Sequence, residues 1–128
     1  MRKVLFLCIQ NTARSVMAES IFNSKAREWR AESAGIERAE RVDEVVARML
    51  AERGMRVKDR PRTLDEVNLD EFDLIVQVCG NECLNLPDSA ECWNIEDPAG
   101  MDEETYRKVY VEIERRVEEL LQRLEGRL

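Results

Sequence analysis

The apolar residues of the chain fall into blocks whose spacing changes along the sequence. Val4 to Leu7 form an unbroken apolar run, as in strands that are buried on both faces of a parallel sheet. Later apolar runs also fit buried strands, and polar or glycine-containing segments separate them. The predicted strands cover residues 2–8, 31–34, 72–78 and 92–95.

Between the strands, apolar residues recur at the three- and four-residue spacing of amphipathic helices. One stripe covers residues 15–30, and a second begins at Val42 and stops at Gly54, a residue type that commonly ends helices. A third stripe, from Val109 to Leu124, predicts one long terminal helix. Its exposed face carries acid-first pairs four residues apart, each contributing roughly 0.3–0.5 kcal/mol. These pairs are Glu103/Arg107, Glu104/Lys108, Glu112/Arg116 and Glu119/Arg123.

Strands that alternate with helices, without repeats or an evident linker, predict an α/β fold. We expect a small four-stranded parallel sheet with helices on both faces, formed by a single catalytic domain over residues 1–128. Ligands of such sheets bind at the carboxyl ends of the strands. Cys8, Cys79 and the region of Asp97 follow strand ends, so we expect them to meet on one rim.

Composition narrows the classes of function. The net charge of −7 argues against a nucleic-acid partner, which requires a basic face. The N-terminal apolar run, Val4 to Ile9, is shorter than a signal-peptide core or a membrane span, so a cytoplasmic location without a membrane partner is expected. The chain has no histidine, which removes Cys-His and Ser-His nucleophile pairs. Proton chemistry must therefore use carboxylates or thiols.

The first predicted strand runs directly into a thiol, in the stretch VLFLCIQNTARS. Cys8 ends the strand, and Arg14 follows six positions later, beside the start of the predicted helix. A loop of this length turns its backbone N–H groups inward, and the positive end of the helix dipole adds to them. Arg14 can close this cradle by binding two oxygens of a tetrahedral oxyanion. The same field favours the thiolate of Cys8, the form that attacks.

Individual loop residues have separate expected roles. Because the loop has no glycine, Asn11 is expected to adopt the left-handed backbone conformation of a tight turn. Ser15 is expected to donate its hydroxyl to the thiolate or to cap the helix. A Cys-x5-Arg spacing also arises by chance around inert buried cysteines, but the flanking strand and helix favour the functional interpretation. The expected substrate-binding residues are Ile9, Gln10, Asn11, Thr12, Ala13, Arg14 and Ser15.

The remaining cysteines allow a second interpretation. Four cysteines are too few for a secreted disulfide scaffold, and the spacing of Cys79 and Cys83 falls within the range of zinc sites. An all-cysteine zinc site would add Cys8 and Cys92 to this pair. It is disfavoured because a cysteine in an anion-binding loop is a poor structural ligand, and Cys92 is expected to be buried as a small apolar residue.

Several motifs, in order along the chain, resemble the low-molecular-weight protein tyrosine phosphatase superfamily. They are CIQNTARS at 8–15, MAE at 17–19, SAG at 33–35, DLIVQVC at 73–79 and DPAG at 97–100. Within this superfamily the chain is most similar to the thioredoxin-coupled arsenate reductases, and the resemblance covers essentially the whole chain. It implies that Cys8 is the nucleophile, Arg14 the oxyanion clamp, and Asp97 the general acid that protonates the leaving oxygen.

A reductase and a phosphatase would differ after the first attack by Cys8. A phosphatase needs water to hydrolyse the adduct, whereas a reductase needs a second thiol to attack the Cys8 sulfur. Cys79 is the candidate for this thiol, and Cys83 would then attack Cys79 and carry the disulfide to a redoxin. Ala99 and Gly100 stand where phosphatases of the superfamily usually place an aromatic residue after the Asp-Pro pair, which favours the reductase.

The function expected from the sequence is therefore arsenate reduction, with a role in arsenic detoxification. A low-molecular-weight protein tyrosine phosphatase and a non-enzymatic oxyanion or redox sensor are the alternatives. Expected partners are arsenate or a phosphate-like oxyanion, and thioredoxin or a similar redoxin. No cofactor and no metal site are expected, and whether a potassium-type ion lies near Asn11, Glu19 and Ser33 stays open.

Overall fold

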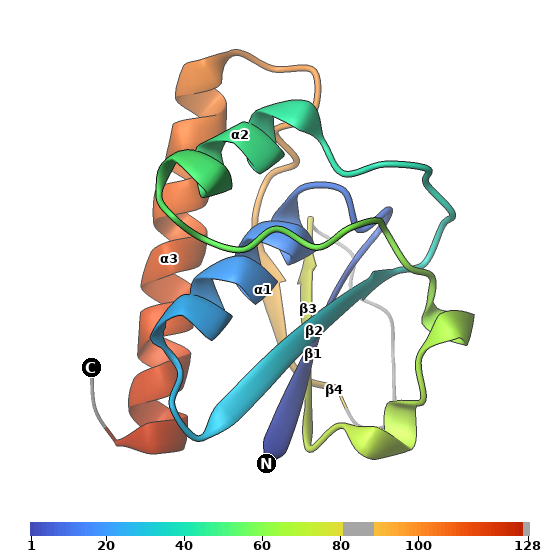
Figure 1. The fold of residues 1–128 in the computed structure, drawn as a ribbon, viewed down its shortest axis with the longest axis vertical. Helices are drawn as coiled ribbons and strands as arrows, with labels where there is room; N and C mark the ends of the chain where they lie inside the picture. Colours follow the sequence, from blue (N-terminus) through green and yellow to red (C-terminus); the bar gives the residue numbers. More distant parts are fainter. Residues whose placement is uncertain (81–88, 127–128) are drawn as a thin grey trace.

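A four-stranded parallel sheet forms the centre of the computed structural model, which describes residues 1–80 and 89–126 (Figure 1). The strands are β1 Arg2–Cys8, β2 Trp29–Gly35, β3 Leu74–Cys79 and β4 Ser89–Asn94. They lie in the order β2-β1-β3-β4, and each neighbouring pair is parallel. The predicted parallel sheet is confirmed, and the carboxyl ends of all these strands lie at one edge.

The two faces of the sheet are covered differently (Figure 1). The α-helices are α1 Arg14–Lys25, α2 Glu44–Glu52 and α3 Glu103–Glu125, and they pack over one face around Val4 and Phe6. The other face presents Leu5 and Leu7 to a smaller cluster. That cluster is completed by the short 3-10 helices Leu64–Glu66 and Leu69–Glu71. We expected helices on both faces of the sheet. Among the described residues, the helices on this second face are the two short 3-10 helices.

The predicted helix over residues 15–30 ends earlier than its pattern indicates. α1 stops at Lys25, and Ala26 turns into extended backbone with φ −73° and ψ 149°. The carboxylate of Glu125, at the far end of α3, accepts hydrogen bonds from the backbone N–H groups of residues 27–29. These N–H groups are thus paired by a residue distant in sequence, which no local periodicity can reveal.

The second and third helices follow the sequence pattern closely. The Asp43 carboxylate caps α2 by accepting from the Val45 and Val46 N–H groups, and Gly54 lies just beyond the helix at φ 73°. No helix in the described ranges has the length and apolar character needed to cross a membrane.

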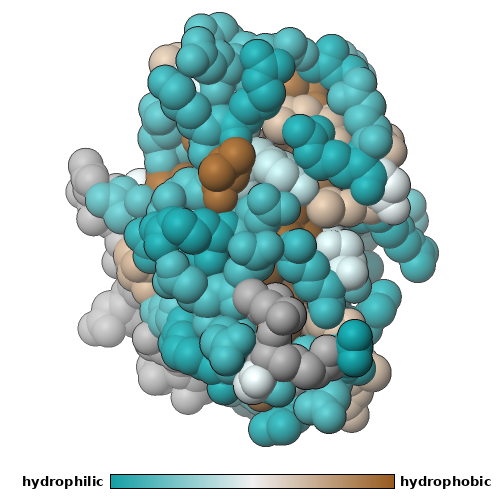
Figure 2. Space-filling model, turned by 90° about the vertical axis from the view of Figure 1, so that its left-hand side faces the viewer, coloured by the Kyte–Doolittle hydropathy of each residue, from teal (hydrophilic) through white to brown (hydrophobic). Residues whose placement is uncertain are grey.

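Figure 2 shows the face that carries α3 as largely hydrophilic, as its charge pattern predicts. Ion pairs form at Glu103/Arg107, Glu104/Lys108 and Glu112/Arg116. The fourth expected pair is replaced, because Glu119 contacts Arg115 and Arg123 reaches Glu91 of β4.

Candidate active site

Two carbonyl groups of the loop between β1 and α1 are bound by neighbouring segments. The Ile9 carbonyl accepts N–H bonds from Ile36 and Glu37, at 2.8 and 2.7 Å, and the Thr12 carbonyl accepts from the Asp43 N–H group at 3.0 Å. Ile9 and Gln10 are exposed, whereas Ala13 and the residues that begin α1 are buried. With these carbonyls held from outside, the loop can present N–H groups toward its interior, as an anion cradle requires.

Asn11 provides the tight turn at the centre of the loop. It is fully buried and adopts the left-handed conformation at φ 58°, as predicted. This turn brings its backbone N–H within 3.2 Å of the Cys8 sulfur, to which it donates. A hydrogen bond to sulfur stabilises the thiolate relative to the thiol.

Ser15 makes the second contact to this sulfur. Its hydroxyl oxygen lies 2.8 Å from Cys8 Sγ and 2.7 Å from Asn11 Nδ2. The amide nitrogen of Asn11 can only donate, so the single hydroxyl proton of Ser15 is free to point at Cys8. Of the two roles predicted for Ser15, donation to Cys8 therefore fits the geometry, because α1 is preceded by Ala13 and has no side-chain cap.

Arg14 joins the loop to the segment that follows β4. Its side chain is buried, with 7% of the side-chain surface exposed. Nη1 donates to the Ile95 carbonyl at 2.9 Å, and Nη2 lies 3.7 Å from Asp97 Oδ2. The other carboxylate oxygen of Asp97 accepts from the Ala99 N–H group at 3.0 Å. Asp97 is half exposed and faces the arginine, a position from which it can reach a ligand in the cradle.

Cys79 lies on the same rim as Cys8. It ends β3, which pairs directly with β1, and its thiol points to the Leu7 carbonyl at 3.9 Å. Both cysteines are buried and free. Burial raises the pKa of Cys79, the nearby Cys8 raises it further, and Arg14 acts in the opposite direction. The two sulfurs thus share one electrostatic environment, as the predicted rim requires.

The other two cysteines differ from these. Cys83 lies outside the described residues. Cys92 is exposed and disulfide-bonded, so the expectation that it is buried is wrong. Alternation along β4 explains the difference, because Trp93 takes the core-facing position against Phe6 and directs its neighbour outward. Within the described ranges, no cluster of three potential metal-ligating side chains occurs.

Tyr106 supports the loop through a contact that the sequence pattern did not single out. From α3 its hydroxyl donates to Asp43 Oδ2 at 2.7 Å. Burial, followed by the hydrogen bond to Asp43, raises the pKa of Tyr106 to about 12, so it stays a donor. Since the Asp43 N–H group holds the Thr12 carbonyl, α2 and α3 together fix one side of the loop.

Gly35 allows β2 to approach this loop closely. A Cβ atom at this position would lie 2.6 Å from the Gln10 carbonyl carbon and 2.8 Å from the Asn11 nitrogen. Both contacts are to backbone atoms, so the loop would have to move. The SAG motif therefore ends in a residue without a side chain because the loop occupies that space.

Gly35→Ala is expected to displace the loop and lower turnover by about tenfold to 100-fold. The overpacked backbone should also reduce the free energy of unfolding by about 1–3 kcal/mol. Gly54→Ala is a matched control, because the added methyl group touches nothing while the positive φ remains strained. It should lower stability with little effect on turnover, and equal activity losses in the two variants would contradict the packing argument.

The chain is similar to known proteins over nearly its whole length. The sequence model of the low molecular weight phosphotyrosine protein phosphatase family matches residues 3–127. The glutaredoxin arsenate reductase of Synechocystis sp. is 32% identical over 133 residues, covering 97% of this chain and 99% of that protein. Among solved structures, the arsenate reductase from Archaeoglobus fulgidus is 63% identical, with a TM-score of 0.88, covering 92% of this chain and 98% of that chain.

A further solved structure adds a thioredoxin-dependent relative. This arsenate reductase from Corynebacterium glutamicum is 26% identical, with a TM-score of 0.78, and the match covers 98% of this chain and 62% of that chain. The fold and the loop define an α/β protein with a buried cysteine at the start of a loop between a parallel strand and a helix. The chain belongs to the low molecular weight phosphotyrosine protein phosphatase family.

Proposed function

We propose that this protein is an arsenate reductase that uses a relay of thiols. The observation that carries the proposal is the pair of free, buried cysteines at the ends of adjacent parallel strands, Cys8 on β1 and Cys79 on β3. A phosphatase needs only the first of them. The relatives named arsenate reductase support the same reaction, because they match nearly the whole length of the chain.

In the first step, the Cys8 thiolate attacks the arsenic atom of arsenate held by the loop and Arg14. An arsenic–oxygen bond breaks, and Asp97 donates the proton with which this oxygen leaves as water. The Ser15 hydroxyl and the Asn11 N–H group hold the sulfur before it attacks. The product is a covalent adduct in which arsenic is still pentavalent.

In the second step, the Cys79 thiolate attacks the Cys8 sulfur. A disulfide forms, the sulfur–arsenic bond breaks, and its electron pair stays on arsenic, which leaves as trivalent arsenite. Two thiols lose two electrons and arsenic gains them. The third step requires Cys83 as a reduced thiol, so any disulfide that it forms with Cys92 must first be opened by the redoxin. Cys83 then attacks Cys79, which frees Cys8, and a redoxin of the thioredoxin or glutaredoxin class reduces the Cys79–Cys83 disulfide.

Phosphate-ester hydrolysis is the second candidate activity, because its first step uses the same Cys8, Arg14 and Asp97. The direct test compares arsenite formation, with thioredoxin or glutaredoxin and their reductases, with hydrolysis of p-nitrophenyl phosphate by the same preparation. Redoxin-dependent arsenite release supports the reductase. Ester hydrolysis without arsenate reduction would favour the phosphatase, and oxyanion binding without turnover of either substrate would favour a sensor.

Asp97→Asn is expected to slow reactions that need a protonated leaving oxygen. An amide cannot donate this proton, so hydrolysis of alkyl phosphates should fall by about 100-fold or more, while activated aryl esters are affected far less. The difference between the two esters is the measurement. Glu96→Gln removes the neighbouring exposed carboxylate and should change neither rate. Equal losses for both esters in Asp97→Asn would assign Asp97 a structural role.

A further inference from the structure

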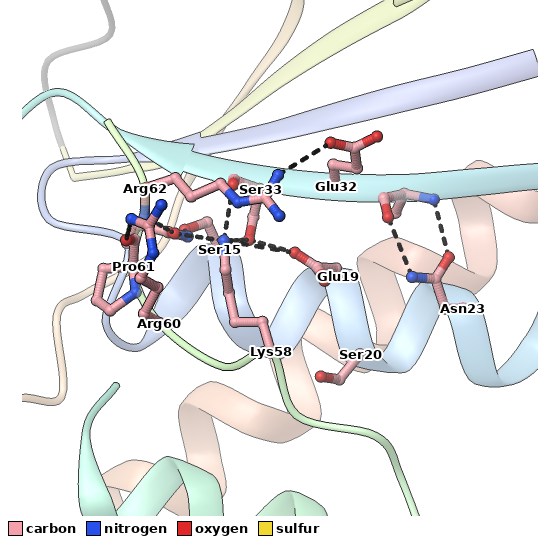
Figure 3. A network of polar contacts seen from close by, with 12 residues as sticks. Ser15, Glu19, Ser20, Asn23, Glu32, Ser33, Lys58, Arg60, Pro61 and Arg62 are labelled. Atoms are coloured by element: carbon pink, nitrogen blue, oxygen red, sulfur yellow. Dashed lines mark hydrogen bonds and ion pairs between the residues drawn. The ribbon is translucent and has the colours of Figure 1, made fainter. Parts of the chain in front are cut away.

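Lys58 places an ammonium group directly behind the candidate loop. It follows α2 in an irregular segment, and only 9% of its side chain is exposed. Figure 3 shows the side chain extended toward Ser33 and Glu19. Nζ donates to Asn11 Oδ1 at 2.6 Å, to the Ser33 carbonyl at 2.8 Å and to Ser33 Oγ at 3.0 Å. These oxygens match the three N–H bonds of the charged ammonium form.

A carboxylate on α1 balances this buried charge. Glu19 Oε1 accepts from Ser33 Oγ at 2.5 Å and lies 3.8 Å from Lys58 Nζ. Burial lowers the pKa of Lys58, and Glu19, Cys8 and Glu32 oppose the change, while Arg62 adds to it. Burial also raises the pKa of Glu19, opposed first by the bond from Ser33 and then by Lys58. Each of the two groups thus favours the charged form of the other.

Asn11 connects this pair to the reacting sulfur. Its Oδ1 atom accepts from Lys58 and also from the Arg62 N–H group at 3.0 Å, so both acceptor positions of this oxygen are filled. This fixes the amide with its nitrogen toward Ser15, whose hydroxyl contacts Cys8. A continuous chain of hydrogen bonds therefore runs from Lys58 through Asn11 and Ser15 to the Cys8 sulfur.

We propose that Lys58 is a positioning residue for the Cys8 thiolate. Its ammonium locks the Asn11 amide, directs the Ser15 hydroxyl onto sulfur and supplies a fixed positive charge behind the loop. The ammonium lies among Asn11, Glu19 and Ser33, the residues around which the sequence left a potassium-type ion open. This inference rests on the proposed function only in taking Cys8 as the reacting thiol.

The experiment measures the thiolate of Cys8 without using arsenate. Cys8 is alkylated with iodoacetamide over a range of pH, and its modification is followed by mass mapping, which separates it from Cys79. Lys58→Met replaces the ammonium by an apolar group of similar length. Alkylation of Cys8 at neutral pH should slow by about tenfold, as its pH profile moves upward by about one unit.

Matched variants separate positioning from loss of structure. Lys25→Met removes another lysine that is paired with a carboxylate, Glu118 at 3.3 Å, and should leave the profile unchanged. Lys58→Arg keeps the charge and should retain most of the reactivity. In Lys58→Ala, added ethylammonium can enter the vacated space and should restore part of the alkylation rate, whereas added tetramethylammonium, which has no N–H donor, should not.

A wild-type pH profile in folded Lys58→Met would overturn the inference. If Lys58→Met does not fold, Lys58→Gln decides, because it keeps a donor but removes the charge: a profile moved upward supports the role of the charge, and an unchanged one overturns it. Arsenate turnover is measured separately on the wild-type protein. A protein that fails to reduce arsenate but shows the Lys58-dependent profile would contradict the proposed function alone.

Discussion

Cys8→Ser is expected to abolish arsenate reduction and phosphate-ester hydrolysis together. The hydroxyl of serine does not ionise at neutral pH, and the chain has no histidine that could deprotonate it. Removal of a catalytic nucleophile lowers turnover by many orders of magnitude, and we expect a loss of at least about 10⁴-fold for each substrate. Initial rates with arsenate and a redoxin system, and with p-nitrophenyl phosphate, provide the measurement.

The same variant should still bind the oxyanion. Serine is close to cysteine in size, and its oxygen can accept from Asn11 and Ser15 as the sulfur does. Calorimetric titration with phosphate should therefore detect binding to Cys8→Ser at close to wild-type affinity. Arg14→Ala is the complementary variant, because it removes the buried guanidinium and should weaken binding and turnover together. Measurable turnover of either substrate by Cys8→Ser would contradict the assignment of the nucleophile.

The features that the sequence predicted well are those determined by neighbouring residues. An unbroken apolar run is typical of a central parallel strand, and β1 has the predicted bounds. The tight turn at Asn11 was also predictable, because few residue types other than glycine tolerate the left-handed conformation. The placement of Cys8 at the end of β1 and of Arg14 at the start of α1 was also predictable, because a strand, a short loop and a helix follow one another directly in the chain.

The features that the sequence did not predict depend on contacts across the chain. The helix predicted over residues 15–30 ran too far, because Glu125, 96 to 98 residues away in the sequence, binds the N–H groups after Ala26. Lys58 lies in a segment without periodicity, and its role becomes visible only when β2 and α1 surround it. Cys92 is exposed because its neighbour Trp93 takes the core-facing position on the edge strand β4. A pattern of a few residues does not determine which of two neighbouring side chains faces the core.

Cys79→Ser is expected to separate the two candidate activities. Serine at this buried position cannot attack the Cys8 sulfur, so arsenate should form its adduct without releasing arsenite. Multiple turnover with a redoxin should fall by at least about 10³-fold, while p-nitrophenyl phosphate hydrolysis stays within about twofold of wild type. The Cys8–arsenate adduct should be detectable by mass spectrometry after rapid quenching. Cys83→Ser should instead complete one turnover and trap Cys8 bonded to Cys79.

The pH dependence of the second step gives an independent test of Cys79. Burial and the neighbouring Cys8 raise its pKa, so at neutral pH most of Cys79 is the unreactive thiol. Below that pKa the thiolate fraction grows about tenfold for each pH unit, and arsenite release in a single turnover should grow with it. Ester hydrolysis, which does not need Cys79, should lack this rise. If Cys79→Ser reduces arsenate at the wild-type rate with a redoxin, Cys79 is not the thiol that attacks the Cys8 sulfur, and the proposed relay is wrong.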